Sequence, residues 1–345
     1  MSLKFYLGAS GSGKSSKLEE DIIARSIAEP DRQFILVVPD QFTMQTQKEV
    51  VLRHPRHGIM NIDVQSFGRL SHRIADETGR SDRLILDDTG KNLVLRKVAA
   101  AIRDDLPTIG SSLGCTGYIH EVKSVISEFE QYGIGPDDID KLIDFTEGKP
   151  FLKGKLKDIK RVFEEMEKFC GGRYITKEEK YDLLAEGIRK SEKLKGSIIA
   201  FDGFTGFTPV QNRVITEMLK TCSEVWMSII MPPEELESYR SADADHRLFS
   251  LSMKTMHSME QLCADAGCDR LPDEEIFGDP VKRYTGKRAL STLEAGIFRE
   301  EKICYENDPS DEIKLFVAQD PKAELKEVFL RIKEMTLTGG YAYRD

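Results

Sequence analysis

Residues 8–15 read GASGSGKS, a full match to the phosphate-loop pattern G-x₄-G-K-S. The apolar run LKFYLG (3–8) precedes this motif, and SSKLEEDIIARSIA (15–28) follows it with apolar residues at helical spacing. The glycines let the backbone wrap around a phosphate, so that its N–H groups and the helix N-terminus face the anion. A Gly/Ser turn that matched the pattern by chance would not be expected to lie between such a strand and such a helix. The motif therefore predicts a nucleotide site in a strand–loop–helix unit.

The nucleotide expected at this loop is ATP with Mg²⁺. Lys14 would reach the β- and γ-phosphates, and Ser15 would hold the metal. Asp202 ends the apolar run GSIIAFDG (196–203) and fits the second metal-side position, although a turn aspartate would look the same. The remaining phosphate contacts would come from Gly8, Ala9, Ser10, Gly11, Ser12 and Gly13.

Gly203 occupies the position where many phosphate-loop ATPases carry a glutamate that activates the attacking water. No acidic residue occurs in the following stretch, GFTGFTPVQNRVIT (203–216). The sequence therefore predicts a site that binds nucleotide but is defective for hydrolysis, and we assign no catalytic residue.

Strand and helix patterns alternate over the first 80 residues, with strands expected at 33–40 and 61–67 and a helix at 69–79. This alternation predicts an α/β fold with a parallel sheet covered on both faces. Residues 80–195 show helical patterns and no clear strand, so we expect an all-α insertion. The strand and helix pattern then resumes. The further elements expected are a helix at 209–222, a strand at 224–232, a helix at about 246–266, and a strand and a helix within 311–345.

Ligands of such a sheet bind beyond the carboxyl ends of its strands. Three of these ends combine phenylalanines with amides, hydroxyls and one arginine, which suits single-stranded nucleic acid because bases stack on rings while polar groups take phosphates. Any one of these phenylalanines could instead be a core residue. The basic stretch RHPRH (53–57) could add a phosphate contact, although a solvated loop is the favoured interpretation. The stretch KGKLKDIKR (153–161) is interpreted as a solvated helix face. The expected DNA contacts are Gln41, Phe42, Thr43, Phe67, Arg69, His72 and Phe207.

The composition limits where and how the chain acts. Its net charge of −9 is unusual for a dedicated nucleic-acid binder, so any DNA affinity must come from a local patch. No apolar run reaches the length of a membrane span, and the N-terminus has no secretory pattern. The six cysteines lack C-x₂-C spacing, which favours reduced thiols and a cytoplasmic protein.

Four segments resemble the motifs of superfamily-one helicases in order and context: GASGSGKS, VVPDQFTMQTQKEV, DVQSFGRLSHRI and IAFDGFTGFTPVQ. Their detailed form resembles the AddB (RexB) family, the B subunits of AddAB helicase–nucleases, over about residues 1–235. The resemblance implies a RecA-like P-loop domain from 1–80 plus 196–268, with 81–195 as its helical insertion. Residues 269–310 would be a linker, and 311–345 would begin a second, truncated RecA-like domain.

The resemblance also implies a function. Members pair with an A subunit at double-strand DNA ends in recombinational repair, and the B subunit engages the single strand scanned for the Chi hotspot. Full-length members carry a C-terminal nuclease domain with an iron–sulfur cluster, which we do not expect in this chain.

Departures from active helicases weigh against a motor. No adenine-reading glutamine motif precedes the first strand, and Met231, Pro232 and Pro233 stand where helicases carry Gly-Asp-x-x-Gln. An active ATP-driven motor nevertheless remains the main alternative. A P-loop kinase and a protein-binding adaptor are the others.

Overall fold

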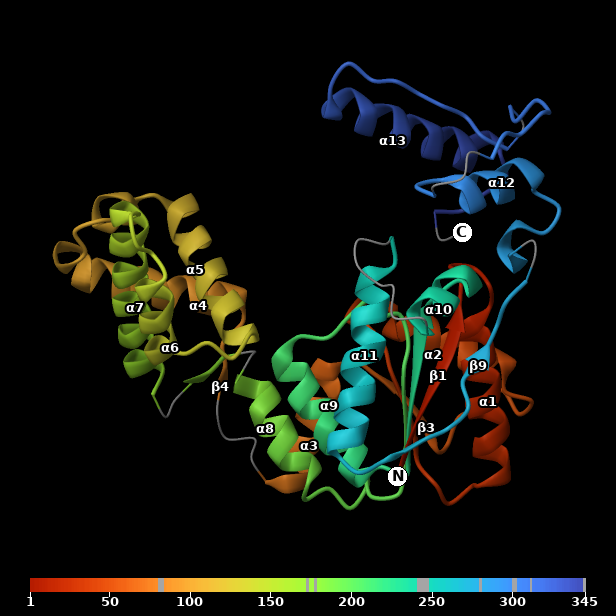
Figure 1. The fold of residues 1–345 in the computed structure, drawn as a ribbon, viewed down its shortest axis with the longest axis horizontal. Coiled ribbons are helices and arrows are strands. Elements are labelled where there is room, and N and C mark those ends of the chain that lie inside the picture. Colours follow the sequence, from red (N-terminus) through yellow and green to blue (C-terminus); the bar gives the residue numbers. More distant parts are fainter. Residues whose placement is uncertain are drawn as a thin grey trace. The chain divides into compact units, whose positions relative to one another are not determined.

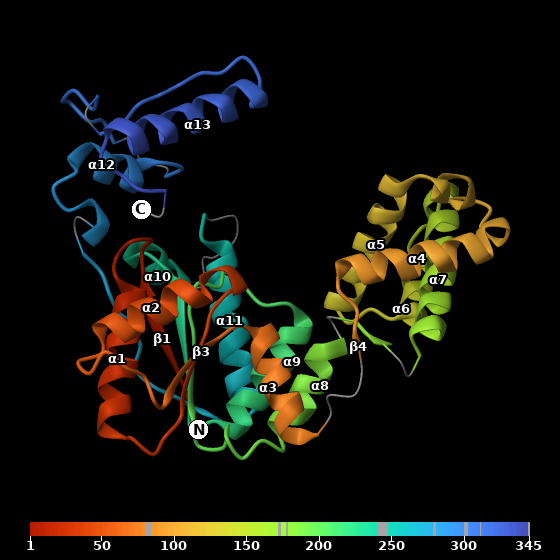
Figure 2. The ribbon, with the colours of Figure 1, turned by 180° about the vertical axis from the view of Figure 1, so that it is seen from behind.

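The computed structural model describes residues 1–79, 84–171, 174–176, 179–240, 248–278, 281–299, 303–310 and 312–343 (Figures 1 and 2). The chain separates into two compact units, Met1–Gly278 and Asp279–Asp345. The strands are β1 (Ser2–Gly8), β2 (Phe34–Val37), β3 (Ile62–Gln65), β4 (Leu84–Ile85), β5 (Tyr174–Ile175), β6 (Ile198–Phe201), β7 (Glu224–Ile230), β8 (Asp269–Arg270) and β9 (Glu274–Glu275). The α-helices of the first unit are α1 (Lys14–Ala28), α2 (Thr43–Arg53), α3 (Phe67–Thr78), α4 (Asp88–Ile102), α5 (Thr116–Gln131), α6 (Pro136–Asp144), α7 (Pro150–Cys170), α8 (Glu179–Ile188), α9 (Pro209–Thr221), α10 (Pro233–Arg240) and α11 (Ser250–Asp265). Short 3-10 helices span Asp40–Phe42, Arg103–Asp105, Gly110–Gly114 and Lys282–Tyr284.

The main sheet is parallel, with strand order β3-β2-β6-β7-β1-β8 and with β9 also paired to β1. Strands β2 and β6 read FILV and IIAF and are buried throughout, because helices cover both faces. Helices α1 and α2 pack on one face, and α3, α8, α9 and α11 pack on the other (Figures 1 and 2). The α/β class and the parallel sheet expected from the sequence are thus confirmed.

Local capping fixes where two helices begin at the carboxyl ends of the strands. Ser66 Oγ accepts the Arg69 N–H at 3.4 Å at the start of α3. Thr208 and Gln211 form a reciprocal capping box at the start of α9, in which Gln211 Oε1 accepts the Thr208 N–H at 2.9 Å. Because both caps follow strand ends, the two helix N-termini lie at the sheet edge that carries the phosphate loop.

Helices α4, α5, α6 and α7 pack around a core of their own, which includes Leu95, Ile139 and Val162. This segment also contains β4 and β5, which pair with each other and not with the main sheet. The expectation of no strand between residues 80 and 195 is therefore wrong. Two-residue strands are too short to produce a detectable period-2 pattern in the sequence.

Helix α8 belongs to the packing of the main sheet. Its Leu184 and Ile188 lie in the same core as α3 and α9, and a Cβ on Gly187 would lie only 2.5 Å from Ile74 Cγ2. From the sequence, this helix was expected to be part of the insertion, with a border at residue 195. The helical pattern shows that α8 has a buried face, but not which partner covers it. The expected border at residues 80–81 and the start of a helix near 246 lie outside the described residues.

Part of the expected linker joins the sheet. Strands β8 and β9 lie within residues 269–310 and pair with β1. Lys4 Nζ contacts Glu274 Oε2 at 3.2 Å and the Arg270 guanidinium lies over the Phe5 ring. Short, charged edge strands lack an apolar pattern, which is why the sequence suggested a linker.

The second unit contains α12 (Arg288–Gly296) and α13 (Pro321–Thr338). The strand expected before α13 does not form in the described residues 312–319, where Leu315 and Val317 are exposed. A strand needs a pairing partner, and this segment has none among the described residues. Within the described parts of the chain, no helix is long and apolar enough to cross a membrane.

Candidate nucleotide and single-strand site

The phosphate loop adopts a conformation that requires glycine. Gly13 has φ of 100° and immediately precedes α1, and Gly11 has φ of 87°. Both values lie in the left-handed region, which glycine enters without steric strain. A Cβ on Gly8 would lie 2.3 Å from Ser12 Oγ and 2.6 Å from the Ile276 carbonyl oxygen. The loop therefore leads directly into the first turn of α1, and helix N-termini of this kind can bind anions.

The two expected magnesium ligands meet across the sheet. Ser15 Oγ donates to Asp202 Oδ1 at 3.0 Å, although 187 residues separate them. Asp202 follows β6 and is 9% exposed. Its Oδ1 also accepts a short hydrogen bond from Ser228 Oγ on β7, the strand between β6 and β1. These residues fit Mg²⁺–ATP, because a hydroxyl and a carboxylate are the protein ligands such a complex uses.

Sequence reasoning missed Ser228. It is buried and holds the Asp202 carboxylate from the neighbouring strand. The one sequence feature that could have identified Ser228 as a site residue is that it carries the single hydroxyl in the apolar run VWMSII. That signal is weak without knowledge that β7 lies beside β6.

Gly203 has a left-handed backbone, with φ of 78°. A Cβ at this position would lie 3.4 Å from Pro39 Cδ, which is an ordinary van der Waals contact. Other residues rarely adopt this conformation. The backbone after Asp202 therefore favours glycine over a residue with a side chain.

A buried acid lies one helical turn beyond Ser15. Glu19 is 3% exposed, and burial raises its pKa to about 7, while the nearby Arg53 acts in the opposite direction. Arg53 Nη1 lies 2.9 Å from Glu19 Oε2, and Arg53 Nη2 donates to Ser16 Oγ at 3.2 Å. The first arginine of the RHPRH stretch, Arg53, therefore joins α2 to the phosphate-loop helix.

The loops after β2, β3 and β6 converge on one edge of the sheet. The Phe42 ring lies 4.0 Å from the Cβ position of Gly203, and the Phe204 ring lies 5.6 Å from the Phe67 ring, centroid to centroid. Asp40 Oδ1 lies 3.9 Å from the Cβ position of Gly68. The structure thus brings the loops at residues 39–43, 66–69 and 203–208 together.

Most of the expected strand-contacting side chains are accessible. Gln41, Arg69 and His72 are exposed, Phe42 is 44% exposed and Phe207 is half-buried. Among the described residues, no carboxylate forms an ion pair with Arg69, whereas the nearby Arg73 pairs with Asp63. Arg69 is therefore available to an external anion.

Two of the expected contacts are buried. Phe67 is 4% exposed and its ring packs against Phe201 and Tyr181, so the expectation of a free ring face is wrong. Thr43 is also buried, and its hydroxyl donates to the Asp40 carbonyl oxygen at 3.0 Å. Both residues begin helices whose first turns face the core, which an isolated strand-end motif does not reveal.

Helix α8 adds a cation that sequence reasoning missed. Lys180 Nζ donates to the Gly68 carbonyl oxygen at 2.9 Å, and burial lowers the pKa of this lysine. Lys180 lies 112 residues from Gly68 in the sequence. No local pattern could have connected the two.

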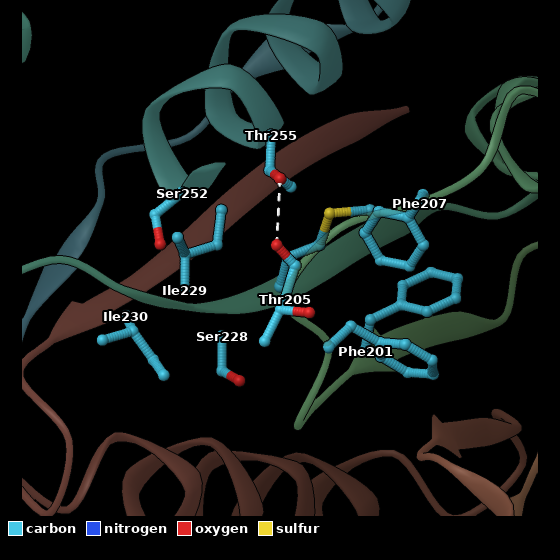
Figure 3. A pocket seen from close by; sticks show the side chains of 10 residues that line it. Phe201, Thr205, Phe207, Ser228, Ile229, Ile230, Ser252 and Thr255 are labelled. Atoms are coloured by element: carbon cyan, nitrogen blue, oxygen red, sulfur yellow. Dashed lines mark hydrogen bonds between the residues drawn. The ribbon is translucent and has the colours of Figure 1, made fainter. Parts of the chain in front are cut away.

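A small cavity is lined by the loop that follows Asp202, by β7 and by α11 (Figure 3). Its volume is about 20 Å³, enough for one water molecule but not for a base. Thr255 Oγ1 of α11 donates to the Thr205 carbonyl oxygen at 3.3 Å, and Phe201 and Phe207 lie on the other side. Helix α11 thus contacts the 203–208 loop through this hydrogen bond.

Comparisons with known proteins point to one family. Residues 5–294 match the family model described as "ADDB, N-terminal". Three similar curated proteins each carry the name of the B subunit of an ATP-dependent helicase/deoxyribonuclease. The protein of Lachnoclostridium phytofermentans is 38% identical over the whole chain, and those of Geobacillus thermodenitrificans and Clostridium novyi are 29% and 27% identical. The chain covers 30% of the length of each of these relatives. This chain therefore belongs to the AddB family, within the region that the family model calls N-terminal.

Proposed function

We propose that this chain is the helicase-like part of an AddB protein that binds single-stranded DNA along the carboxyl edge of a RecA-like sheet. The same edge would bind ATP with Mg²⁺ at a site degenerate for hydrolysis. Support comes from the family match, from the names of the relatives, and from strand β7 lying between the phosphate-loop strand and the Asp202 strand. Helices α4 to α7, with a core of their own, would be the inserted helical part.

One observation carries the DNA proposal. Arg69, in the first turn of α3, is exposed and has no ion pair among the described residues. With Gln41 and Phe42 it lies on segments that contact the loop following Asp202. A cation, an amide and an accessible ring supply the phosphate contact, polar contact and stacking platform that single strands require. Phe67 would support this surface from below and not stack on a base.

The nucleotide proposal rests on the chain's own residues. Lys14 and the N-terminus of α1 would hold the phosphates, while Ser15 and Asp202 would hold Mg²⁺. Ser228 fixes the orientation of Asp202. Gly203 offers no carboxylate to position a water molecule, so bound nucleotide would remain largely unhydrolysed and could serve to stiffen the edge that holds DNA.

The wider role follows from the family. The relatives' names imply a multisubunit enzyme, so we propose an A subunit as partner and DNA double-strand ends as substrate, in recombinational repair in the cytoplasm. Scanning for the Chi sequence would be a task of the single-strand surface. The nuclease activity and the iron–sulfur cluster would belong to other parts of full-length members.

The direct test measures binding of a labelled oligothymidine by anisotropy as the salt concentration rises. Arg69→Ala should weaken binding and lower the salt slope by about 0.7, the contribution of one phosphate contact on a single strand. Arg56→Ala is the matched control, because Arg56 is also exposed and makes no ion pair among the described residues. If both variants bind like the parent, the single-strand surface is not at this edge.

The intact phosphate loop and the Ser15–Asp202 contact favour one second candidate, an active ATP-driven motor. Rapid phosphate release that depends on Lys14 and is stimulated by single-stranded DNA would identify it.

A further inference from the structure

Lys180, in the first turn of α8, is a half-buried cation without a carboxylate partner. Its Nζ donates to the Gly68 carbonyl oxygen at 2.9 Å, and among the described residues no carboxylate lies within 4.0 Å of it. Burial lowers the pKa of this lysine, because the ammonium group has lost part of its hydration. The buried Lys91 shows the usual arrangement, with its Nζ 2.6 Å from Glu130 Oε2. The desolvation of Lys180 is offset by one neutral acceptor only, which leaves its charge for an external anion.

The start of α8 is fixed, so this ammonium group has a defined position. Glu179 Oε2 accepts the Thr176 N–H at 2.8 Å, and Thr176 Oγ1 accepts the Glu179 N–H at 3.2 Å, which caps the helix reciprocally. The Tyr181 ring packs against the Phe67 ring with centroids 5.8 Å apart, and α8 lies beside α3 (Figures 1 and 2). A cation on a fixed helix loses less conformational entropy when it binds an anion than a cation on a mobile loop does.

Helix geometry places this ammonium group beside Arg69. In an α-helix the carbonyl of residue i points at the N–H of residue i+4, so the Gly68 carbonyl points along α3 toward His72. Successive residues are about 100° apart around the axis, so His72 lies about 40° and Arg69 about 100° from Gly68 in the same direction. Both side chains are exposed. The ammonium group of Lys180, the His72 side chain and the Arg69 side chain therefore follow one another around the first two turns of α3.

The same glycine connects Lys180 to the proposed single-strand side. Asp40 Oδ1 lies 3.9 Å from the Cβ position of Gly68, and Asp40 directly precedes Gln41 and Phe42. Asp40 attracts the ammonium group of Lys180, but it is exposed and does not lie within ion-pair distance. Water and salt screen such an exposed charge, so Asp40 does not occupy the ammonium group. Lys180 thus borders the segment that carries Gln41 and Phe42.

We propose that Lys180 binds a phosphate of single-stranded DNA, next to the phosphate contact proposed for Arg69. The two cations contact neighbouring phosphates, so the strand passes along the first turns of α3. The proposal rests on the proposed function, because it adds a contact to the same single-strand surface. The added contact comes from α8, so Lys180 can be changed without altering the loops at the strand ends.

The first test measures how Lys180→Met changes the salt dependence of oligothymidine binding. Methionine keeps an unbranched apolar stem but carries no charge. Loss of one phosphate contact should reduce the magnitude of the slope of log affinity against log salt by about 0.7, and should weaken binding about fivefold at about 0.1 M salt. Lys180→Arg should restore both values, because the guanidinium keeps the charge and the donors.

The matched control is Lys190→Met. Lys190 follows the far end of α8, is exposed and forms no ion pair among the described residues, so this variant should leave the slope and the affinity unchanged. Unfolding midpoints are measured alongside, because Lys180→Met also removes the hydrogen bond to Gly68. A Lys180→Met variant that loses stability but keeps the slope of the parent would show that Lys180 only holds α8 on α3, and the inference would be wrong.

The second test asks whether the group that Lys180 contacts is a phosphate. Binding of oligothymidine is compared with binding of an uncharged methylphosphonate strand of the same length. Lys180→Met should bind the uncharged strand as tightly as the parent does, because the contact that the variant lacks is absent from that strand. The preference of the parent for the charged strand should therefore shrink about fivefold in the variant at about 0.1 M salt.

The outcomes separate this inference from the proposed function. If Arg69→Ala weakens binding and Lys180→Met does not, the single-strand surface lies at the sheet edge without Lys180, and only the inference fails. If Lys180→Met weakens binding of the charged and the uncharged strand equally, Lys180 does not contact a phosphate and the inference is wrong. If the parent chain binds no single strand, both proposals fail.

Discussion

At the scale of single residues, the glycine after Asp202 is explained by its backbone. Its φ of 78° places Gly203 where a residue with a Cβ is strained by about 1–2 kcal/mol. The loop that turns here carries Phe204 and Phe207 into the aromatic cluster beside Phe67. A glutamate at this position would have to adopt the same turn, so the missing carboxylate and the loop conformation are linked.

Gly203→Glu should therefore lower the free energy of unfolding by about 1–2 kcal/mol without creating an ATPase. Urea unfolding and phosphate release, measured together on the variant, check this. Gly117→Ala is a suitable control, since Gly117 lies in α5 with nothing within 4 Å of its Cβ position and should be neutral or slightly stabilising. A Gly203→Glu variant that is as stable as the parent and hydrolyses ATP would show that this explanation of the glycine is wrong.

Glu19 should make stability depend on pH. Its pKa is raised by burial to about 7 in the folded chain, against 4.5 for the ordinary group, so the folded state binds the proton more tightly. The tighter proton binding stabilises the folded state by an amount on the order of 3 kcal/mol. This stabilisation is fully present below pH 4.5 and is lost as pH rises through 7. Urea unfolding of the parent and Glu19→Gln between about pH 5 and 8 tests this. The parent should lose stability relative to the variant as pH rises, and parallel curves would contradict the expectation.

At the scale of elements, the sequence was sufficient wherever a local pattern and its context agreed. The phosphate loop between an apolar strand and an amphipathic helix located β1 and α1 almost to the residue, and the strand-end aspartate was placed correctly beside Ser15. The failures were elements defined by a distant partner. Strands β8 and β9 exist because they pair with β1, and Lys180 reaches Gly68 because α8 packs on α3. Neither the strand pairing nor the Lys180–Gly68 hydrogen bond produces a periodic pattern in the sequence.

The packing of α8 on α3 can be tested at Gly187. A Cβ there would lie 2.5 Å from Ile74 Cγ2, so Gly187→Ala should force the two helices apart and destabilise the chain by about 1–3 kcal/mol. It should also weaken oligothymidine binding if Lys180 and Gly68 belong to the single-strand surface. Unfolding midpoints and anisotropy measure the two effects. Unchanged stability would mean that α8 does not pack on α3 as described, despite the helix propensity gained from alanine.

At the scale of the whole chain, both proposed sites lie at one edge of the sheet. The phosphate loop and Asp202 form the proposed nucleotide side, and the exposed Arg69, Gln41 and Phe42 form the proposed single-strand side. The two sides share the loop at residues 203–208, which contacts Phe42 and Phe67. If both proposed sites bind their ligands, we expect nucleotide to influence the strand-binding side without turnover, because ligands that stabilise the same local arrangement favour each other's binding.

The central claim is that the site binds nucleotide and does not turn it over. It is tested most directly by calorimetric binding of Mg²⁺–ATP and by phosphate release, measured on the parent and on Lys14→Ala under the same conditions. We expect that the parent binds Mg²⁺–ATP, that Lys14→Ala binds it much more weakly, and that both release phosphate at the background rate. Rapid phosphate release by the parent that Lys14→Ala abolishes would contradict the claim, and so would a parent that binds no nucleotide.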